Sequence, residues 1–164
     1  MNKFIVDAFE FCRLNELRDG VIAIAEMPRL TAESPTDQRS INWSIVGGAD
    51  QVGHAQLTVV VKGVISLICQ RCLGAVDFQI ESSSTLVLAH SEQEADEIEA
   101  LLANDAVDVV AVDKKLDIAE LIEDEILLAI PQSTKHAVCP TDAITVLDAA
   151  KKPSAFAALK DLKL

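Results

Sequence analysis

Two long segments in which apolar and polar residues alternate constrain the fold of this chain more than any other feature. In the first segment the apolar residues at alternate positions are Leu57, Val59, Val61, Ile65, Leu67 and Cys69, with Gly63 in the middle of the series. In the second segment Val76, Phe78 and Ile80 alternate with polar residues, and the run continues to Leu86 and Leu88. A period of two residues is typical of a β-strand with one buried face. Because only residues 70–74 separate the segments, the sequence predicts a long antiparallel hairpin with a cysteine-containing turn at its tip.

The remaining segments predict an α+β fold. At 164 residues, the chain is long enough to bury about 70% of its unfolded surface without disulfides or metal. Strands dominate the first two-thirds and helices the end, so we expect a single domain over residues 1–164, built on a curved, partly barrel-like antiparallel sheet. The expected elements are a helix at 8–18, strands at 21–27, 41–48 and 107–112, a loop at 31–40, an acidic amphipathic helix from 117 to 130, and a short helix at 153–162.

Acidic residues outnumber basic ones and are concentrated in one window. The net charge is −12, and residues 92–125 contain 13 acidic and two basic residues. Within this window, residues 91–106 are expected to form an acidic loop or a solvated helix. A negative field repels phosphate backbones and attracts basic partners, although the same charge also simply keeps a protein in solution.

The N-terminal residues do not resemble a secretory signal, because Asp7 and Glu10 interrupt the apolar residues that precede them. No segment approaches the roughly 20 apolar residues that span a bilayer. We therefore expect a cytoplasmic protein without a membrane partner. In that compartment its four cysteines are expected to be reduced thiols or metal ligands.

Two pairs of candidate metal ligands share the same spacing. Cys69 and Cys72 are separated by two residues in the predicted turn, and His136 and Cys139 are separated by two residues in the loop-rich segment 132–152. Three thiolates and one imidazole suit tetrahedral zinc, provided that the fold closes the 63-residue gap between the pairs. The alternative is that Cys69 packs as a small apolar residue and Cys72 is merely exposed. Redox chemistry is disfavoured, since reactive C-x-x-C motifs open a helix and this one lies between strands.

Glu125 is the acidic residue in an unexpected position. It falls within the apolar stripe of the helix after Asp117, whereas Glu123 and Asp124 fall outside that stripe. A buried carboxylate requires a partner, and we expect Arg71 of the cysteine turn to supply it. The alternative is that Glu125 lies at the edge of the stripe and reaches water.

Catalytic motifs are not apparent in the sequence. It contains no G-x-S-x-G, no phosphate-binding glycine loop and no H-E-x-x-H, and its three histidines have no local acid and nucleophile arranged for a triad. We therefore expect a protein without enzymatic activity.

Several blocks together resemble the large ribosomal RNA subunit accumulation protein family, also called YceD. They begin with Cys69-Gln70-Arg71-Cys72 and continue through 117–121, 123–131 and His136-x-x-Cys139 to the ending Pro153-x-x-Phe156-Ala157-x-Leu159-x-x-Leu162-Lys163. The blocks run in the family's order from about residue 57 to the C-terminus, while the first 50 residues match only loosely.

The resemblance implies a non-enzymatic bacterial protein that supports the synthesis, processing or stability of large-subunit (23S) rRNA. The family's recurring features map onto Cys69, Arg71, Cys72 and residues 125–128. Some members carry additional cysteines after the proline that ends the helix, where this chain offers only His136 and Cys139.

Three mechanisms remain open at this point. The protein could act as a monomer whose acidic face binds ribosomal proteins or rRNA-processing factors, and its charge favours this mechanism. It could instead bind precursor 23S rRNA directly through Arg71 and the lysines between Lys151 and Lys163. The third is a zinc-ribbon-like adaptor with no role in ribosome synthesis. No cofactor other than zinc is expected.

Overall fold

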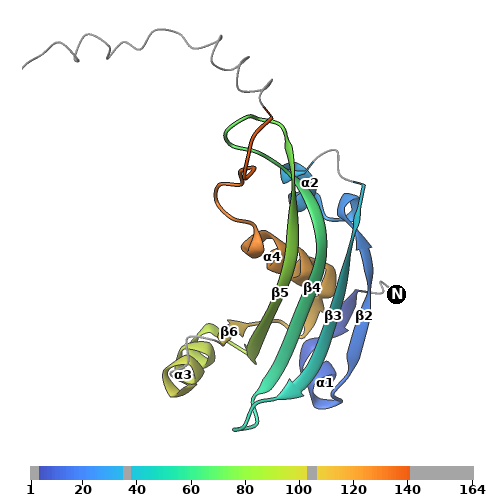
Figure 1. Cartoon of the computed structure of the whole chain (residues 1–164). Helices are drawn as coiled ribbons and strands as arrows, with labels where there is room; N and C mark the ends of the chain where they lie inside the picture. The colour runs from blue at the N-terminus through green and yellow to red at the C-terminus, as the bar shows by residue number, and fades with distance from the viewer. Residues whose placement is uncertain (1–3, 35–37, 103–106, 141–164) are drawn as a thin grey trace, which may run out of the picture.

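The computed structural model describes residues 4–34, 38–102 and 107–140 (Figure 1). The elements follow in the order β1 (Ile5–Asp7), α1 (Ala8–Arg13), β2 (Leu17–Ala23), a 3₁₀ turn (Ile24–Glu26), α2 (Pro28–Glu33), β3 (Ser40–Ala49), β4 (Ala55–Ile68), β5 (Ala75–Ala89), α3 (Glu92–Leu102), β6 (Asp108–Ala111), β7 (Lys115–Asp117) and α4 (Ile118–Ala129). Helices and strands are both well represented, which confirms the α+β class.

A five-stranded sheet in the order β2-β3-β4-β5-β6 forms the framework. The predicted hairpin is present as β4 and β5, which pair antiparallel without interruption from Gln56 opposite Val87 to Ile68 opposite Ala75. The sheet is open, with β2 and β6 at its edges, so the expectation of a partly barrel-like sheet is wrong. The expectation of a wholly antiparallel sheet is also wrong, because β6 pairs parallel to β5 after the crossover through α3.

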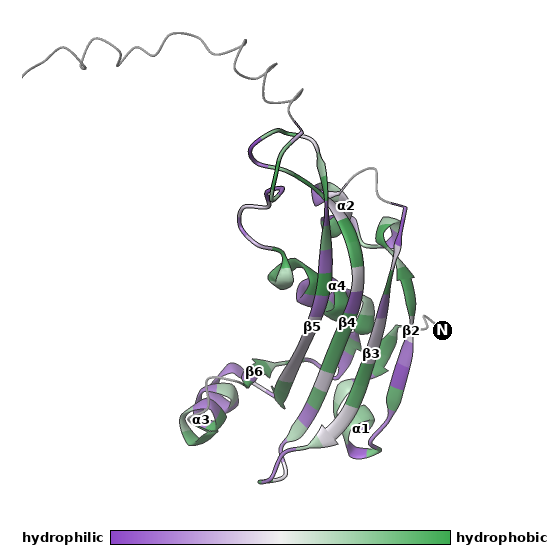
Figure 2. Ribbon diagram, viewed as in Figure 1, coloured by the Kyte–Doolittle hydropathy of each residue, from purple (hydrophilic) through white to green (hydrophobic). Residues whose placement is uncertain are grey.

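One face of the sheet carries the main core. Alternate residues of β4 are buried on this face, and Figure 2 shows the alternation of hydropathy along the strand. They pack in one cluster with Phe11 of α1 and with Ile122 and Ile126 of α4. The other face is wetter, and there Lys62 of β4 forms an ion pair of 2.7 Å with Glu81 of β5.

The acidic segment 91–106 contains a helix, α3, which covers the opposite face of the sheet near β6. Ala95 and Ile98 of α3 are buried against Val87 and Ala89 of β5. Residues 92–102 therefore form a packed amphipathic helix with its acidic side chains toward solvent, and residues 103–106 of the segment lie outside the described residues.

The N-terminal third differs most from the expected boundaries. The first helix ends at Arg13 rather than at residue 18, and the following strand is Leu17–Ala23 rather than 21–27. Helix α2 extends into the segment 31–40, which was expected to be a loop. Pro28 occupies the first turn of this helix, where its missing N–H costs nothing, and Leu30 is fully buried.

The segment after α4 agrees with the expected loop as far as it is described. Residues 131–140 contain neither helix nor strand. The rest of the predicted loop, 141–152, and the predicted helix at 153–162 lie outside the described residues. Among the helices that are described, none has the length and apolar composition needed to cross a membrane.

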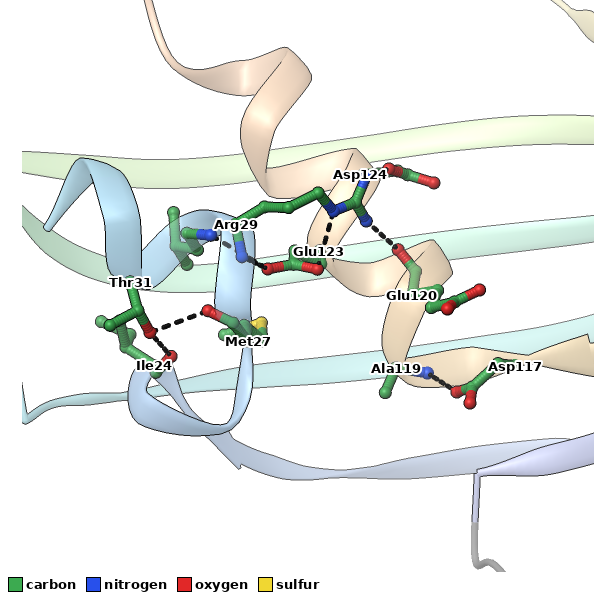
Figure 3. A network of polar contacts seen from close by, with 10 residues as sticks. Ile24, Met27, Arg29, Thr31, Asp117, Ala119, Glu120, Glu123 and Asp124 are labelled. Atoms are coloured by element: carbon green, nitrogen blue, oxygen red, sulfur yellow. Dashed lines mark hydrogen bonds and ion pairs between the residues drawn. The ribbon is translucent and has the colours of Figure 1, made fainter. Parts of the chain in front are cut away.

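A carboxylate from α4 caps α2 (Figure 3). The side chain of Glu123 is almost completely buried and accepts hydrogen bonds from the backbone N–H groups of Arg29 (2.6 Å) and Leu30 (2.9 Å). It also accepts from Nε of Arg29 (3.0 Å), whose Nη1 reaches Asp124 (2.5 Å). The expectation that Glu123 lies on the polar face is wrong, because free N–H groups at the start of α2 satisfy it in the interior.

Gly47 lies where α1 crosses β3, and we expect Gly47→Ala to lower the free energy of unfolding by about 1–3 kcal/mol. A Cβ there would lie 2.6 Å from the carbonyl oxygen of Phe11 and 2.9 Å from Cα of Cys12. Both are backbone atoms, so α1 itself would have to move. At the neighbouring Gly48 the nearest atom would be 3.8 Å away, so urea unfolding of Gly48→Ala should match the wild type. Equal losses at both positions would contradict this account.

Asp50 organises the turn between β3 and β4. Its Oδ1 accepts hydrogen bonds from the backbone N–H groups of Val52, Gly53 and His54, and its Oδ2 lies 2.7 Å from Nδ1 of His54. Burial opposes ionisation, but the His54 ring and these N–H groups outweigh it and lower the pKa of Asp50 from 3.8 to about 2.

Because this pKa is lowered on folding, the stabilisation by Asp50 is complete above pH 4 and is lost as the pH falls toward 2. Asp50→Asn should therefore lower the free energy of unfolding by about 1–2 kcal/mol at pH 7 and by much less at pH 2. Urea titrations of both proteins at the two pH values measure this difference. A loss that is independent of pH would assign the effect to packing instead.

Candidate metal centre

The hairpin tip is a tight turn that brings two cysteines together. The N–H of Cys69 donates to the carbonyl of Gly74, and the N–H of Leu73 donates to the carbonyl of Cys69, both at 2.9 Å. Leu73 adopts a left-handed backbone conformation with φ of 58°. This closed turn holds Sγ of Cys69 and Sγ of Cys72 within 4.8 Å of each other.

The segment after α4 returns to this tip and closes the 63-residue gap. The N–H of Gln70 donates to the carbonyl of Thr134 at 2.9 Å. Two residues later along the returning segment, the N–H of His136 points at Sγ of Cys69 at 3.4 Å. These backbone contacts place the second pair of candidate ligands against the first.

The four predicted ligands form one cluster. The Sγ atoms of Cys69, Cys72 and Cys139 and a ring nitrogen of His136 all lie within 4.8 Å of one another. Sγ of Cys69 is 3.8 Å from Sγ of Cys139, and Sγ of Cys72 is 3.4 Å from Nδ1 of His136. A tetrahedral zinc ion with Zn–S about 2.3 Å and Zn–N about 2.0–2.1 Å has donor–donor edges of about 3.8 and 3.5 Å. The arrangement therefore fits zinc, and binding itself stays a prediction.

The environment of the cluster suits metal ligation. All three cysteines are buried, and the partly buried Val76 packs against them. Nε2 of His136 lies 2.9 Å from the carbonyl oxygen of Ala75 and donates to it, which leaves the lone pair of Nδ1 directed at the cysteines. A backbone acceptor behind the imidazole is the usual means of fixing the tautomer of a ligating histidine.

The fold favours the thiolate at Cys69. Burial opposes ionisation of this thiol, but the backbone N–H groups of Cys72, His136 and Arg71 point at the sulfur, and together they lower its pKa to about 5. The pKa of Cys139 is raised, by burial and by the neighbouring sulfurs of Cys69 and Cys72. A bound cation would balance the charge of a second thiolate beside Cys69, so metal binding would favour ionisation of Cys139.

Cys12 lies apart from this cluster. It is buried on α1, where its Sγ donates to the carbonyl of Gln56 at 3.2 Å, and burial raises its pKa. None of the four cysteines forms a disulfide. Cys12 thus provides a matched control for substitutions in the cluster.

The expected pairing of Glu125 with Arg71 is wrong. Glu125 of α4 packs against the middle of β5 and accepts hydrogen bonds from the hydroxyl groups of Ser82 and Ser84, the latter at 2.5 Å. Arg71 lies at the exposed tip, before β5 begins. The sequence did contain the relevant signal, since Ser82 and Ser84 occupy alternate positions of the predicted strand and so share a face. Functional roles for Arg71 and Glu125 stay predictions.

The comparison with family models gives one match, described as large ribosomal RNA subunit accumulation protein YceD, over residues 57–163. This span contains the hairpin, the cluster at its tip, α3 and α4. Neither the curated proteins nor the solved structures contain a significant match to the chain. Because the matched span exceeds half of the sequence, the chain belongs to the YceD family of large ribosomal RNA subunit accumulation proteins.

Proposed function

We propose that this protein is a non-enzymatic factor that supports the accumulation of 23S rRNA through basic protein partners in assembling large-subunit particles. The observation that carries the proposal is the family match over residues 57–163, since the family is named for accumulation of large-subunit rRNA. The class of partner is inferred from the surface of the molecule.

In this proposal the cluster of Cys69, Cys72, His136 and Cys139 holds one structural zinc ion. Four protein ligands complete a tetrahedral shell and leave no open position for water or substrate. The ion would bind the segment after α4 to the hairpin tip and so present both as one rigid surface.

The surface chemistry supports a protein partner. The net charge is −12, and Glu92, Asp96, Glu97 and Glu99 of α3 are exposed. Such a field attracts basic proteins and repels phosphate backbones.

Three large apolar side chains at the tip support the same partner class. Ile68, Leu73 and Val138 are 50%, 64% and 85% exposed around the buried cluster. Exposed apolar residues grouped on one surface are typical of contacts with protein.

Direct binding of precursor rRNA is the second candidate. The observation that favours it is that Arg71 and Lys135 are exposed beside the same cluster. Affinity of the purified protein for naked precursor rRNA that falls steeply as salt rises would support this candidate over the first. A zinc-ribbon-like adaptor with no ribosomal role is the third.

The test is complementation of a strain that lacks the gene. We expect the deletion to lower the ratio of 23S to 16S rRNA and the peak of free large subunits in sucrose gradients. The wild-type chain and Cys12→Ser should restore both, whereas Cys69→Ser combined with Cys72→Ser should not. Immunoblots establish that the variants accumulate equally, and a normal 23S to 16S ratio in the deletion strain would refute the proposal.

A further inference from the structure

An apolar groove lies between α4 and the β5–β6 side of the sheet. Its volume is about 610 Å³. Two of its apolar residues are unusually accessible, Val110 at 38% exposed and Leu128 at 84% exposed. The apolar residues that line it include Leu86, Leu88, Val110, Leu116, Leu121 and Leu128. Apolar surface left open in this way is typical of a docking site.

Acidic residues line the same groove. Asp108 of β6 and Asp124 and Glu125 of α4 contribute to its wall. Asp124 is partly neutralised by Arg29, at 2.5 Å. Within the described part of the chain, Asp108 and Glu125 have no ion pair with a base. The groove therefore suits a segment that is apolar on one side and carries positive charge beside it.

The C-terminal segment of the chain has this chemistry. It reads Pro153-Ser154-Ala155-Phe156-Ala157-Ala158-Leu159-Lys160-Asp161-Leu162-Lys163. In a helix, Phe156, Leu159 and Leu162 lie on one side, and Lys160 and Lys163 follow Phe156 and Leu159 by four residues, next to them on the surface.

The connection is long enough for this segment to reach the groove. The last described residue, Pro140, follows Cys139 at the hairpin tip. Ser84 lines the groove and pairs with Val59 of β4. Val59 precedes Cys69 by ten residues, so the groove at Ser84 lies about 34 Å from the hairpin tip along the strand. Residues 141–155 can span about 50 Å when extended. Because the segment is tethered, its effective concentration at the groove is on the order of millimolar, so modest affinity suffices.

We propose that residues 153–163 dock as an amphipathic helix in the apolar groove of their own chain. Phe156, Leu159 and Leu162 face the apolar wall, and Lys160 and Lys163 face Asp108 and Glu125. The docked segment covers Leu128. This inference goes beyond the proposed function and concerns the protein alone.

The test is photocrosslinking of the purified full-length chain with benzoylphenylalanine in place of Leu128. We expect a product of monomer mass in which peptide mapping joins α4 to residues 153–160. The same group in place of Val21, which is 63% exposed on β2 across the sheet, serves as the control and should give no such product. Lys160→Glu combined with Lys163→Glu should lower the yield at least threefold, whereas the two arginine replacements should retain it.

Two outcomes would overturn the proposal. Crosslinks to the tail that appear only in a product of dimer mass would assign the groove to a second copy. A yield at position 128 no higher than at position 21 would show that the tail does not occupy the groove. Neither result depends on any effect of the protein on rRNA, so this inference and the proposed function can fail separately.

Discussion

Cys139→Ser is expected to remove zinc from the protein and to lower its melting temperature by about 10 °C. The substitution takes one thiolate from a buried four-ligand cluster whose donors lie within 4.8 Å of one another. A structural zinc site contributes its binding energy to folding, and a loss of a few kcal/mol shifts the melting temperature of a chain this size by about this amount. Elemental analysis and calorimetry measure the two effects on protein purified without chelators or a metal-binding tag.

Cys12→Ser is the matched control for this prediction. Cys12 is buried like the cluster cysteines, but it donates to a backbone carbonyl outside the cluster, and serine can do the same. We expect one zinc per chain in this variant, as in the wild type. A wild-type protein that contains no zinc would contradict the prediction and leave Cys69, Cys72 and Cys139 as packing residues.

Glu123→Ala is expected to lower the free energy of unfolding by about 2–4 kcal/mol, measured by urea titration. The substitution leaves the backbone N–H groups of Arg29 and Leu30 without their acceptor at a buried helix end. It also removes the ion pair of Glu123 with Nε of Arg29, one of the contacts between α2 and α4 in Figure 3. Glu123→Gln should be intermediate, because an amide oxygen can still accept from one of these groups.

Asp124→Ala is the matched control for Glu123. Asp124 is the next residue of α4 and also pairs with Arg29, but its side chain is 52% exposed. Exposed ion pairs contribute little, so we expect a loss below about 0.5 kcal/mol. Similar losses at the two positions would show that the ion pairs with Arg29, rather than the cap on α2, provide the stability.

The elements that the sequence predicted well are those specified by local patterns. The alternation in 57–69 and 76–88 predicted β4 and β5, since a strand with one buried face imposes that period on its own residues. Asp117 and Pro131 predicted the ends of α4, and Asp117 does accept from the N–H of Ala119 as a helix cap. Where the local signal was weak, as in α2, the prediction was wrong.

The partners of the acidic residues could not be predicted from α4 alone. The helical period placed Glu125 on the apolar face and Glu123 off it, yet the structure buries Glu123 almost completely. It was α2 that buried Glu123, by supplying N–H groups from residues more than 90 positions away, and the register of β5 that supplied Ser82 and Ser84 to Glu125. A helix pattern contains no information about which distant segment packs on each face.

By itself, the sequence determined the hairpin, the helix α4, the ligand types of the cysteine cluster and the motifs of the YceD family, because each is written in neighbouring residues. Only the tertiary structure decided that β6 is parallel, that the sheet is open and that Glu123 is buried. It also decided that His136 and Cys139 meet Cys69 and Cys72. These features depend on contacts between segments far apart in the chain, which the packing of the whole core selects.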